Sequence, residues 1–580
     1  MPVDPDTEKF IRIIALKNSV EHDGNAHLDA VIAKFVGSKP ELRSHIKSLI
    51  SEIRTIVQQI NALPFVDQKS LLEELAPGKV AATKKQVAEH QLPALEGAIH
   101  GKVVTRFPPE PNGYPHIGHA KAAIIDEEYA RMYSGMLILR FDDTNPLKEK
   151  LEYYDAISEG LQWLGVKPDI TKNTSDDIEL LHNYGRNLMD LGGAYVCTCS
   201  QEMIHNLRAK GIACKCRLDS VPTLDRIDKL FDGSYEENEA IVRFKGDMGD
   251  KNTAMRDPTL FRIIDHDHPK LGNRVRVWPT YDFAAPIEDS VDGVTHALRT
   301  KEYELRNTLY FAILDKLGLR KPYLVEFSRL EFDGIPVSKR KISPLIENGT
   351  IERWDDPRLP TLAGLRRRGF VPEAIRKFVL SLGLTLAETK PPFESLEAFN
   401  RKIIDPISLR LFFVKNPVEV HVKGGQEMDV VLKNHPTDAH LGTRKLKVSN
   451  KFYIDGGDAA GLKVGEEIRL IELYNIKVTN IDWRNDASSI IITAEVAGNE
   501  IRQSMAKVQW IANNDIVDYK VMIPKELYLS GEDYNTNSLE IVQGFAESFV
   551  SRLKRNTHVQ FVRFGFCRID DNQMAIMTHR

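Results

Sequence analysis

The stretch RFPPEPNGYPHIGHAKA, residues 106–122, decides the fold of the central part of the chain. It follows a β-branched run at 103–105 and leads into the alanine-rich segment HAKAAIIDEEYARMYSG at 119–135. We therefore expect a strand, a glycine-containing loop and a helix in this order. A second apolar strand at 136–141 precedes another segment with apolar residues at helical spacing. This alternation predicts a parallel sheet with helices on its faces.

The texture of the sequence changes on both sides of this region. The predicted class is multidomain α/β, with a Rossmann-like parallel-sheet domain, an insertion into it, helical N-terminal and linker domains, and C-terminal β-barrels. The predicted boundaries are 1–98 for the helical N-terminal domain, 99–195 and 279–344 for the two halves of the sheet domain, 196–278 for the insertion, 345–410 for the helical connecting domain, and 411–580 for the β-barrel region.

Composition excludes several classes of protein. The chain has 580 residues, 42% of them apolar and 28% charged, and no uninterrupted apolar run long enough to span a bilayer, so we expect a soluble protein without a membrane partner. Five cysteines exclude a disulfide framework, and the start MPVDPDTEKF lacks the layout of a secretory signal, which predicts a cytoplasmic location. The net charge of −4 does not by itself point to a polyanionic partner.

Two motifs in the sheet domain suggest nucleotide chemistry. His116 and His119 lie three residues apart where the predicted helix begins, and a helix N-terminus with nearby glycines suits a phosphate. Taken alone, the HxxH spacing favours helix-capping histidines that bind no ligand. The second motif is VSKRK at 337–341, where Lys339 could neutralise charge on a leaving pyrophosphate, although three cations on a loop are usually solvated surface.

Four cysteines fall within twenty residues of the predicted insertion. Cys197, Cys199, Cys214 and Cys216 form two CxC pairs that could supply four thiolates to one structural Zn²⁺. The alternative is a set of reduced, unligated thiols. His266 and His268 in DHDHP are interpreted as loop residues rather than as ligands.

Together, the two nucleotide motifs resemble the HIGH and KMSKS signatures of class I aminoacyl-tRNA synthetases, in the form typical of the glutamyl- and glutaminyl-tRNA synthetase subfamily. RFDDTNP (140–146), MRDP (255–258), YDFAAPIEDSVDGVTHALRTKEY (281–303) and EFSRLEF (326–332) fit the same subfamily in the same order. The resemblance spans at least residues 100–415. The insertion then corresponds to the region that meets the acceptor end of tRNA, and the β-rich C-terminus looks like the two-barrel anticodon-binding region of the glutaminyl and archaeal/eukaryotic-type glutamyl enzymes.

The resemblance implies roles for individual residues. Arg106 would pair with a carboxylate of the amino acid, Asp142 would hold its ammonium group, and Tyr281 would line the pocket. The residues implied in contacting ATP, bound with Mg²⁺, are Glu110, Asn112, His116, Gly118, His119, Ser338, Lys339 and Arg340, of which His116, His119 and Lys339 are the catalytic candidates.

The resemblance also bears on the choice of amino acid. Glutamyl enzymes place an arginine at the position of Arg299, whereas glutaminyl enzymes place a small neutral residue there. A γ-carboxylate requires a cation, and a neutral amide would leave a buried guanidinium unpaired. Arg299 therefore favours L-glutamate, and Leu324, where glutaminyl enzymes have a glutamine, points the same way.

The predicted function is ATP-dependent attachment of L-glutamate to tRNA(Glu) through a glutamyl-adenylate, with tRNA(Gln) as a further candidate substrate and little ATP–pyrophosphate exchange in the absence of tRNA. The alternatives are a glutaminyl-tRNA synthetase, a small nucleotidylyltransferase and an inactive tRNA-binding scaffold. We expect a monomer whose helical N-terminal domain docks tRNA, another synthetase or a factor.

Overall fold

The structure is a computed structural model of the chain. It describes residues 5–21, 24–38, 46–76, 92–218, 223–337, 339–388, 390–483, 490–502, 505–529 and 533–580. The chain divides into two compact units, Met1–Gln91 and Leu92–Arg580. No helix within the described ranges combines the length and the apolar character that a membrane crossing needs.

The N-terminal unit is helical, as its spacing of apolar residues predicts. Its helices are α1 (Pro5–Glu21), α2 (Leu28–Ser38), α3 (Ile46–Asn61) and α4 (Phe65–Leu75). Their apolar faces meet in a core that includes Ile11, Phe35 and Ile53. Gln68 is buried in this core, where its amide nitrogen donates to the carbonyls of Gly24, Ile60 and Leu63 and thereby ties the α3–α4 connection to the helices.

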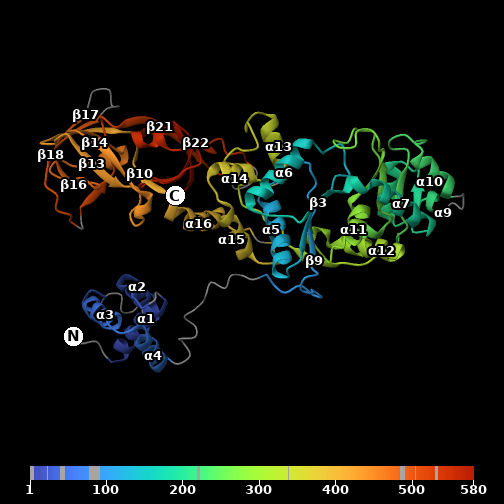
Figure 1. The fold of residues 1–580 in the computed structure, drawn as a ribbon, viewed down its shortest axis with the longest axis horizontal. Helices are drawn as coiled ribbons and strands as arrows, with labels where there is room; N and C mark the ends of the chain where they lie inside the picture. The colour runs from blue at the N-terminus through green and yellow to red at the C-terminus, as the bar shows by residue number, and fades with distance from the viewer. Residues whose placement is uncertain are drawn as a thin grey trace. The chain divides into compact units, whose positions relative to one another are not determined.

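The second unit begins with a parallel sheet (Figure 1). Strands β1 (Val104–Phe107), β2 (Met136–Phe141) and β3 (Ile170–Asn173) pair in that order, and β8 (His296–Thr300) pairs in parallel with β9 (Tyr323–Phe327). The Thr295 amide donates to the Val104 carbonyl oxygen at 2.9 Å and so places β8 beside β1. The strand order is therefore β3-β2-β1-β8-β9, and the carboxyl ends of β1 and β8 are neighbours.

Helices connect these strands on the faces of the sheet. They are α5 (Ile117–Met132) between β1 and β2, α6 (Leu151–Leu164) between β2 and β3, α7 (Ile178–Asp190) after β3, α11 (Tyr281–Val291) before β8, and α12 (Asn307–Leu317) between β8 and β9. The helix α6 ends at Gly165, whose φ of 74° lies in the left-handed region that glycine adopts without strain. The helices α5 and α6 bury an apolar core together with β1, β2, β8 and β9, whereas α7, α11 and α12 contribute to a second core with residues between 194 and 277.

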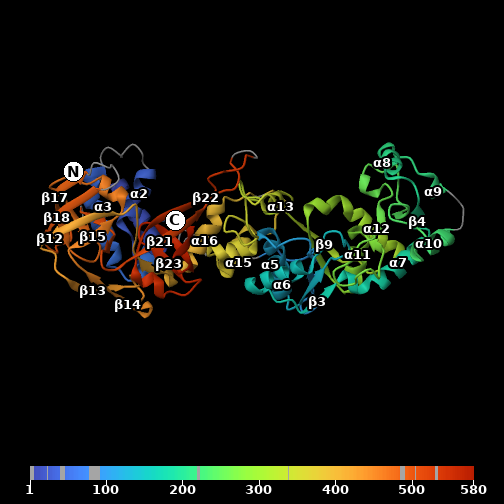
Figure 2. The same ribbon diagram turned by 90° about the horizontal axis from the view of Figure 1, so that it is seen from above.

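The insertion is a small antiparallel sheet with helices. Its strands are β4 (Ala194–Cys197), β5 (Ile241–Phe244), β6 (Thr259–Ile263) and β7 (Val277–Pro279), and its helices are α8 (Gln201–Lys210), α9 (Lys215–Leu218) and α10 (Thr223–Phe231). Figure 2 shows the three helices in the same end of the molecule as β4 and α7. The chain passes from β7 of the insertion to α11 of the sheet domain with one residue between them, so α11 begins at Tyr281 where the two parts join.

The remaining chain is helical and then β-rich. The helices are α13 (Lys339–Glu347), α14 (Leu362–Arg368), α15 (Pro372–Leu382) and α16 (Phe393–Ile404). Two seven-stranded sheets follow, ordered β10-β23-β24-β25-β21-β22-β11 and β19-β16-β17-β18-β12-β15-β20, together with the hairpin β13–β14. The bounds are β10 Leu409–Leu411, β11 Phe413–Lys415, β12 Val418–Lys423, β13 Met428–Lys433, β14 Thr443–Val448, β15 Lys451–Ile454, α17 Gly456–Ala460, β16 Glu467–Leu470, β17 Asn475–Trp483, β18 Ile490–Val496, β19 Ala506–Val508, β20 Trp510–Ala512, β21 Ile516–Pro524, β22 Leu539–Glu547, β23 His558–Phe561, β24 Gly565–Asp571 and β25 Met574–His579.

The predicted multidomain α/β class, with its parallel sheet and its β-rich C-terminal part, is confirmed. The run VQFVRFGF at 559–566 is β-rich, and the structure divides it between β23 and β24. Arg563 occupies a left-handed conformation with φ 62°, and the chain reverses there. The sequence does not indicate this turn, because the position holds neither a glycine nor an asparagine.

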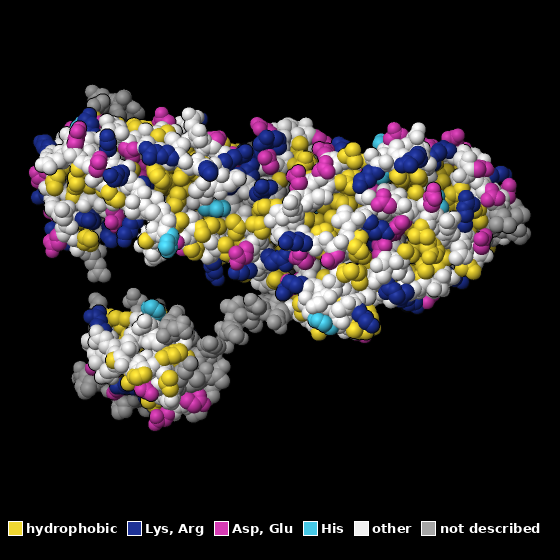
Figure 3. All heavy atoms as spheres, viewed as in Figure 1, with side chains coloured by type: hydrophobic (Ala, Val, Ile, Leu, Met, Phe, Trp, Pro, Cys, Tyr) yellow, Lys and Arg dark blue, Asp and Glu magenta, His cyan; other side chains and the backbone are white. Residues whose placement is uncertain are grey.

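Charged side chains of both signs are interspersed over the face shown in Figure 3. No uniformly basic face is visible in this view of the described residues. The surface therefore agrees with the near-neutral balance of 78 basic and 82 acidic residues.

Candidate active site

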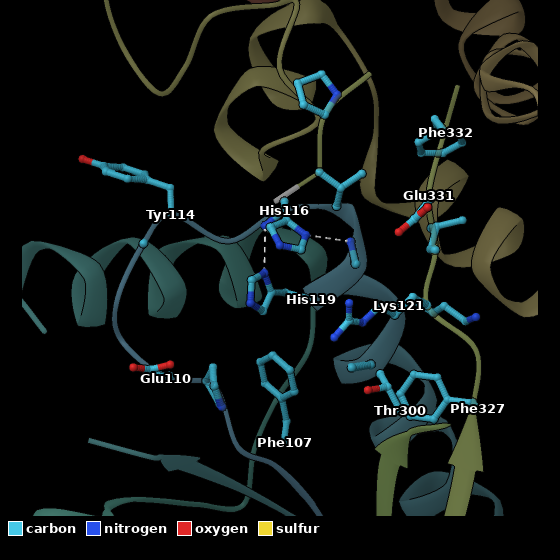
Figure 4. A pocket seen from close by; sticks show the side chains of 18 of the residues that line it. Phe107, Glu110, Tyr114, His116, His119, Lys121, Thr300, Phe327, Glu331 and Phe332 are labelled. Carbon is cyan, nitrogen blue, oxygen red and sulfur yellow. Dashed lines mark hydrogen bonds between the residues drawn. The ribbon is translucent and has the colours of Figure 1, made fainter. Parts of the chain in front are cut away.

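The two histidines of the HIGH-like motif form the N-terminal cap of α5. His116 is the cap residue, and its Nδ1 accepts a hydrogen bond from the Gly118 amide at 3.1 Å. The His116 amide in turn donates to Nδ1 of His119 at 3.2 Å, and the ring centroids lie 4.0 Å apart (Figure 4). Since Nδ1 of each ring accepts, each neutral ring must carry its proton on Nε2.

Burial keeps both rings neutral. It lowers the pKa of His119 to about 4, and burial together with the neighbouring His119 lowers the pKa of His116 well below its ordinary value. The site therefore offers two uncharged Nε2–H donors near neutral pH rather than two cations. Such donors can contact phosphate oxygens without the cost of burying a charge.

Backbone contacts fix the segment before α5. The Ile117 amide donates to the Pro360 carbonyl oxygen, and the Leu362 amide donates to the Pro115 carbonyl oxygen, both at 2.9 Å. The ring of Tyr114 stacks on Trp354 with centroids 5.2 Å apart. The segment 354–362, which follows α13, thus holds the HIGH-like segment in place.

A cavity of about 850 Å³ opens in front of the start of α5 and the carboxyl ends of β1 and β8. Figure 4 shows Glu110, His119 and Phe107 on one side of it and Lys121 and Phe327 on another. Eight of the residues predicted from the sequence line this cavity: Arg106, Glu110, Asn112, His116, Gly118, His119, Tyr281 and Arg299. Residues from both halves of the sheet domain therefore meet in one site.

Three predicted residues of the KMSKS-like loop are not among the described residues that line the cavity. Ser338 and the side chain of Lys339 lie outside the described residues. Arg340 is exposed on α13 and does not line the cavity, whereas its neighbours Val337 and Lys341 do. The predicted ATP contacts of these three residues stay predictions.

Arg106 lies at the floor of the cavity but is already paired. Its Nε and Nη2 donate to the two carboxylate oxygens of Asp289 at 3.1 and 3.2 Å, and its Nη1 donates to the Leu298 carbonyl oxygen at 2.6 Å. Tyr310 also donates to Asp289, at 2.9 Å. Arg106 is therefore a partly committed cation, and only its remaining N–H groups are free to meet a substrate carboxylate.

Asp142 lies beside the cavity, although it is not part of its described lining. Its Oδ1 accepts from Nε of Arg140 and from the hydroxyl of Thr174, each at 3.1 Å. Burial raises the pKa of this carboxyl, and Arg140 opposes the rise. Burial raises the pKa of Tyr281 and of Tyr303, which both line the cavity, and the Asp142 carboxylate adds to the rise.

Arg299 is a buried cation surrounded by aromatic rings. Its guanidinium carbon lies 4.9 Å from the ring centroid of Tyr303, 5.5 Å from that of Tyr310 and 5.9 Å from that of Tyr281. The side chain is 5% exposed, and its Nε and Nη1 have no hydrogen-bond partner among the described residues. A buried guanidinium with two unused donors at a cavity wall is suited to an anionic ligand.

Lys121 is a site residue that the sequence did not reveal. It lies on α5 one turn beyond His116, lines the cavity and donates from Nζ to the Ser328 carbonyl oxygen at 2.5 Å. Burial lowers its pKa to about 8. Its apolar surroundings place it in the interior, while the sequence shows only one more lysine on an alanine-rich helix.

The four cysteines of the insertion converge. Their Sγ atoms all lie within 4.8 Å of one another, with Cys197 to Cys214 at 3.8 Å and Cys199 to Cys216 at 3.7 Å. A tetrahedral site with Zn–S bonds of about 2.3 Å has S–S edges of roughly 3.8 Å, so these spacings fit Zn²⁺. The residues present therefore fit the metal that the CxC pairs suggested.

Comparisons with known proteins agree with this geometry. Three family descriptions match the chain: the catalytic domain of tRNA synthetases class I (E and Q) at 102–406, and two anticodon-binding domains of the same class at 408–499 and 507–570. "Glutamate--tRNA ligase" of Cenarchaeum symbiosum is 49% identical over 98% of each chain, and that of Nitrosopumilus maritimus is 48% identical over 100% of each. The solved glutamate-tRNA synthetase of Elizabethkingia anophelis is 22% identical, with a TM-score of 0.39 over 53% of this chain and 71% of its own. The chain belongs to the class I tRNA synthetases of the E and Q type.

Proposed function

We propose that the chain attaches L-glutamate to tRNA(Glu) in an ATP-dependent reaction. The observation that carries the choice of amino acid is Arg299, a cavity-lining residue whose buried guanidinium has no hydrogen-bond partner at Nε or Nη1 among the described residues. Glutamine would leave this charge unmatched, whereas the γ-carboxylate of glutamate would neutralise it. The names of the archaeal relatives support the same choice.

The first step forms glutamyl-adenylate. The α-carboxylate of glutamate attacks the α-phosphorus of ATP, the bond to the leaving oxygen breaks, and pyrophosphate departs. We assign the Nε2–H groups of His116 and His119 to the phosphate oxygens, because both rings hold their other nitrogen as an acceptor toward the backbone. ATP enters as its Mg²⁺ complex, and Lys339 is proposed to neutralise the leaving pyrophosphate.

Asp142 and the tyrosines orient the amino acid for this attack. The ammonium group would lie between the Asp142 carboxylate and the hydroxyls of Tyr281 and Tyr303. Arg106 holds the α-carboxylate side through the N–H groups that Asp289 leaves free. No protein nucleophile takes part, because the substrate itself supplies the attacking oxygen.

The second step transfers glutamate to tRNA. The 2′-hydroxyl of the terminal adenosine attacks the carbonyl carbon of the mixed anhydride, and AMP leaves. The two sheets that match anticodon-binding domains support tRNA as the acceptor. We further propose one structural Zn²⁺ on Cys197, Cys199, Cys214 and Cys216, which would brace the insertion against the acceptor end.

The function is tested by aminoacylation of tRNA(Glu) and tRNA(Gln), each offered labelled glutamate or glutamine. We expect charging with glutamate only, and the tRNA(Gln) arm determines whether that tRNA is a further substrate. In Arg299→Gln, kcat/KM for glutamate should fall by roughly 100-fold, since a charged hydrogen bond contributes about 1.5–3 kcal/mol.

Arg299→Lys is the matched control. It keeps the charge but loses the forked donor, so we expect a smaller decrease than for Arg299→Gln. Charging of glutamine by the wild-type enzyme at a kcat/KM equal to that of glutamate would show that the chain is a glutaminyl-type enzyme. Absence of charging with either amino acid, despite ATP and tRNA, would favour a binding scaffold.

A further inference from the structure

His268 is buried where the insertion meets the sheet domain. It lies between β6 and β7, is 1% exposed, and stacks on Trp278 with ring centroids 5.0 Å apart. Its Nδ1 accepts from the amides of Lys270 and Leu271, each at 3.2 Å. These two bonds fix the tautomer, so the proton of the neutral ring is on Nε2.

Nε2 of His268 lies close to two buried carboxylates of another element. It lies 3.2 Å from Oε2 of Glu149 and 3.6 Å from Oδ2 of Asp143. Asp143 already accepts from the amide and hydroxyl of Ser175 and from the hydroxyl of Tyr154. Oε2 of Glu149 and Nε2 of His268 are both buried, and neither has a hydrogen bond of ordinary geometry among the described residues, so their 3.2 Å contact brings two otherwise unsatisfied polar atoms together.

Both carboxylates belong to the loop that carries Asp142: Asp143 follows Asp142 directly, and Glu149 is the last residue of the loop. Within this loop, residues 142–149, Oε1 of Glu149 accepts from the Asn145 amide at 2.6 Å. Ser175, which anchors Asp143, directly follows Thr174, whose hydroxyl donates to Asp142. Contacts that hold Asp143 and Glu149 therefore determine where the Asp142 carboxylate lies.

Two further contacts join the same parts of the chain. Nη2 of Arg262 on β6 lies 3.4 Å from the Thr144 carbonyl oxygen, and Nζ of Lys270 donates to Oδ1 of Asn173 at 2.8 Å. Both are less buried than the His268 contacts. Arg262 on β6 and His268 in the following connection thus contact loop 142–149, and Lys270 contacts the end of β3.

We propose that His268 is a positioning residue for the amino acid, anchoring loop 142–149 and through it the Asp142 carboxylate. This inference rests on the proposed function, in which Asp142 accepts the ammonium group of glutamate. It assigns to the insertion a part in holding the amino-acid site. Loss of the Nε2–H donor leaves the buried Glu149 carboxylate unmatched, and the loop must move to bring it to water.

The test separates the two nitrogens of His268. In His268→Asn, the amide oxygen can replace Nδ1 as the acceptor for the loop amides, but no donor reaches Glu149. In His268→Gln, the amide nitrogen can replace the Nε2–H donor, but the Nδ1 acceptor is lost. We expect KM for glutamate to rise on the order of tenfold in His268→Asn, with KM for ATP and kcat unchanged within about twofold, and to rise less in His268→Gln.

His266→Asn is the matched control, because His266 is exposed two residues earlier in the same DHDHP sequence. The double variant His268→Asn/Glu149→Gln removes the unmatched charge together with its donor. Its KM for glutamate should lie between the values of the wild-type enzyme and of His268→Asn. It also serves as the comparison where His268→Asn alone does not fold.

An unchanged KM for glutamate in a folded His268→Asn enzyme would overturn the inference. So would an equal rise in the KM values for glutamate, ATP and tRNA with a lowered Tm, because that pattern is structural damage alone. Failure of the proposed function is recognised separately, since wild-type enzyme and His266→Asn would then both fail to charge glutamate.

Discussion

The histidines at the start of α5 show how local geometry sets chemistry at a single residue. Each uses Nδ1 to accept from a backbone amide, so the cap that starts the helix also orients the two Nε2–H groups. By itself, the HxxH spacing favours capping over phosphate binding. In the structure one arrangement serves both, because capping by Nδ1 leaves the opposite nitrogen free for a ligand.

The lowered pKa of His119 predicts an unusual pH dependence. With a folded-state pKa of about 4 and an unfolded value of about 6.5, the folded state binds fewer protons between these values. Stability from this group is therefore complete above pH 6.5 and is lost as pH falls toward 4. The ¹³Cε1 resonance of His119, assigned with His119→Asn, should not titrate between pH 8 and pH 5.5. A midpoint near 6.5 would show that the ring is solvated.

Residue roles could be predicted where the informative neighbours are close in sequence. Arg299 and the HIGH-like pair were identified from short motifs, and the structure brings them to one cavity. Lys121 and His268 could not be identified in this way, because their partners lie far along the chain. Ser328 is 207 residues from Lys121, and Glu149 is more than one hundred residues from His268. The prediction that His268 is a loop residue is correct, but the sequence did not indicate that its side chain is buried.

At the level of elements, buried strands were predicted well and turns poorly. Residues 136–141 form β2 with the predicted bounds, because five of the six side chains are buried and β-forming. The segment between β8 and β9 begins as a 3₁₀ helix at Lys301–Arg306 and becomes α12 at Asn307. A break of this kind depends on contacts such as that of Arg306 with Asp282, which periodicity does not contain.

The cysteine cluster predicts a measurable metal. Because four Sγ atoms lie at spacings suited to tetrahedral coordination, we expect about one zinc per chain by elemental analysis. Cys199→Ser and Cys214→Ser should each reduce the zinc content to near zero. They should also expose the insertion to proteolysis within 196–278, because β4 and α9 are joined through these thiolates.

Cys567→Ser provides the control for this element. Cys567 is also buried, yet it lies in β24, away from the other four cysteines in the sequence, and it should leave zinc content unchanged. Stoichiometric zinc in Cys214→Ser would contradict the assignment of the four ligands.

At the scale of the molecule, the question is how a chain of net charge −4 meets a polyanion. The sequence places a basic excess at 321–380, which includes VSKRK and the run Arg366–Arg368. The structure removes two of these three arginines from consideration. Arg367 pairs with Asp570 at 3.1 Å, and Arg368 pairs with Glu397 at 2.6 Å and packs over Phe393, whereas Arg366 is exposed. Of the run Arg366–Arg368, one arginine is therefore left exposed.

This division predicts opposite phenotypes for neighbouring residues. Arg366→Gln should leave Tm unchanged and raise KM for tRNA, and the slope of log KM against log salt should fall by about one, as expected for the loss of one phosphate contact. Arg368→Gln should instead lower Tm, because removing one partner of a largely buried ion pair costs roughly 3–5 kcal/mol. Aminoacylation at several salt concentrations and calorimetry on both variants give the two readouts. If Arg366→Gln shows the same salt slope as the wild-type enzyme, the tRNA does not contact α14 at this arginine, and its phosphates must be met elsewhere on the interspersed surface.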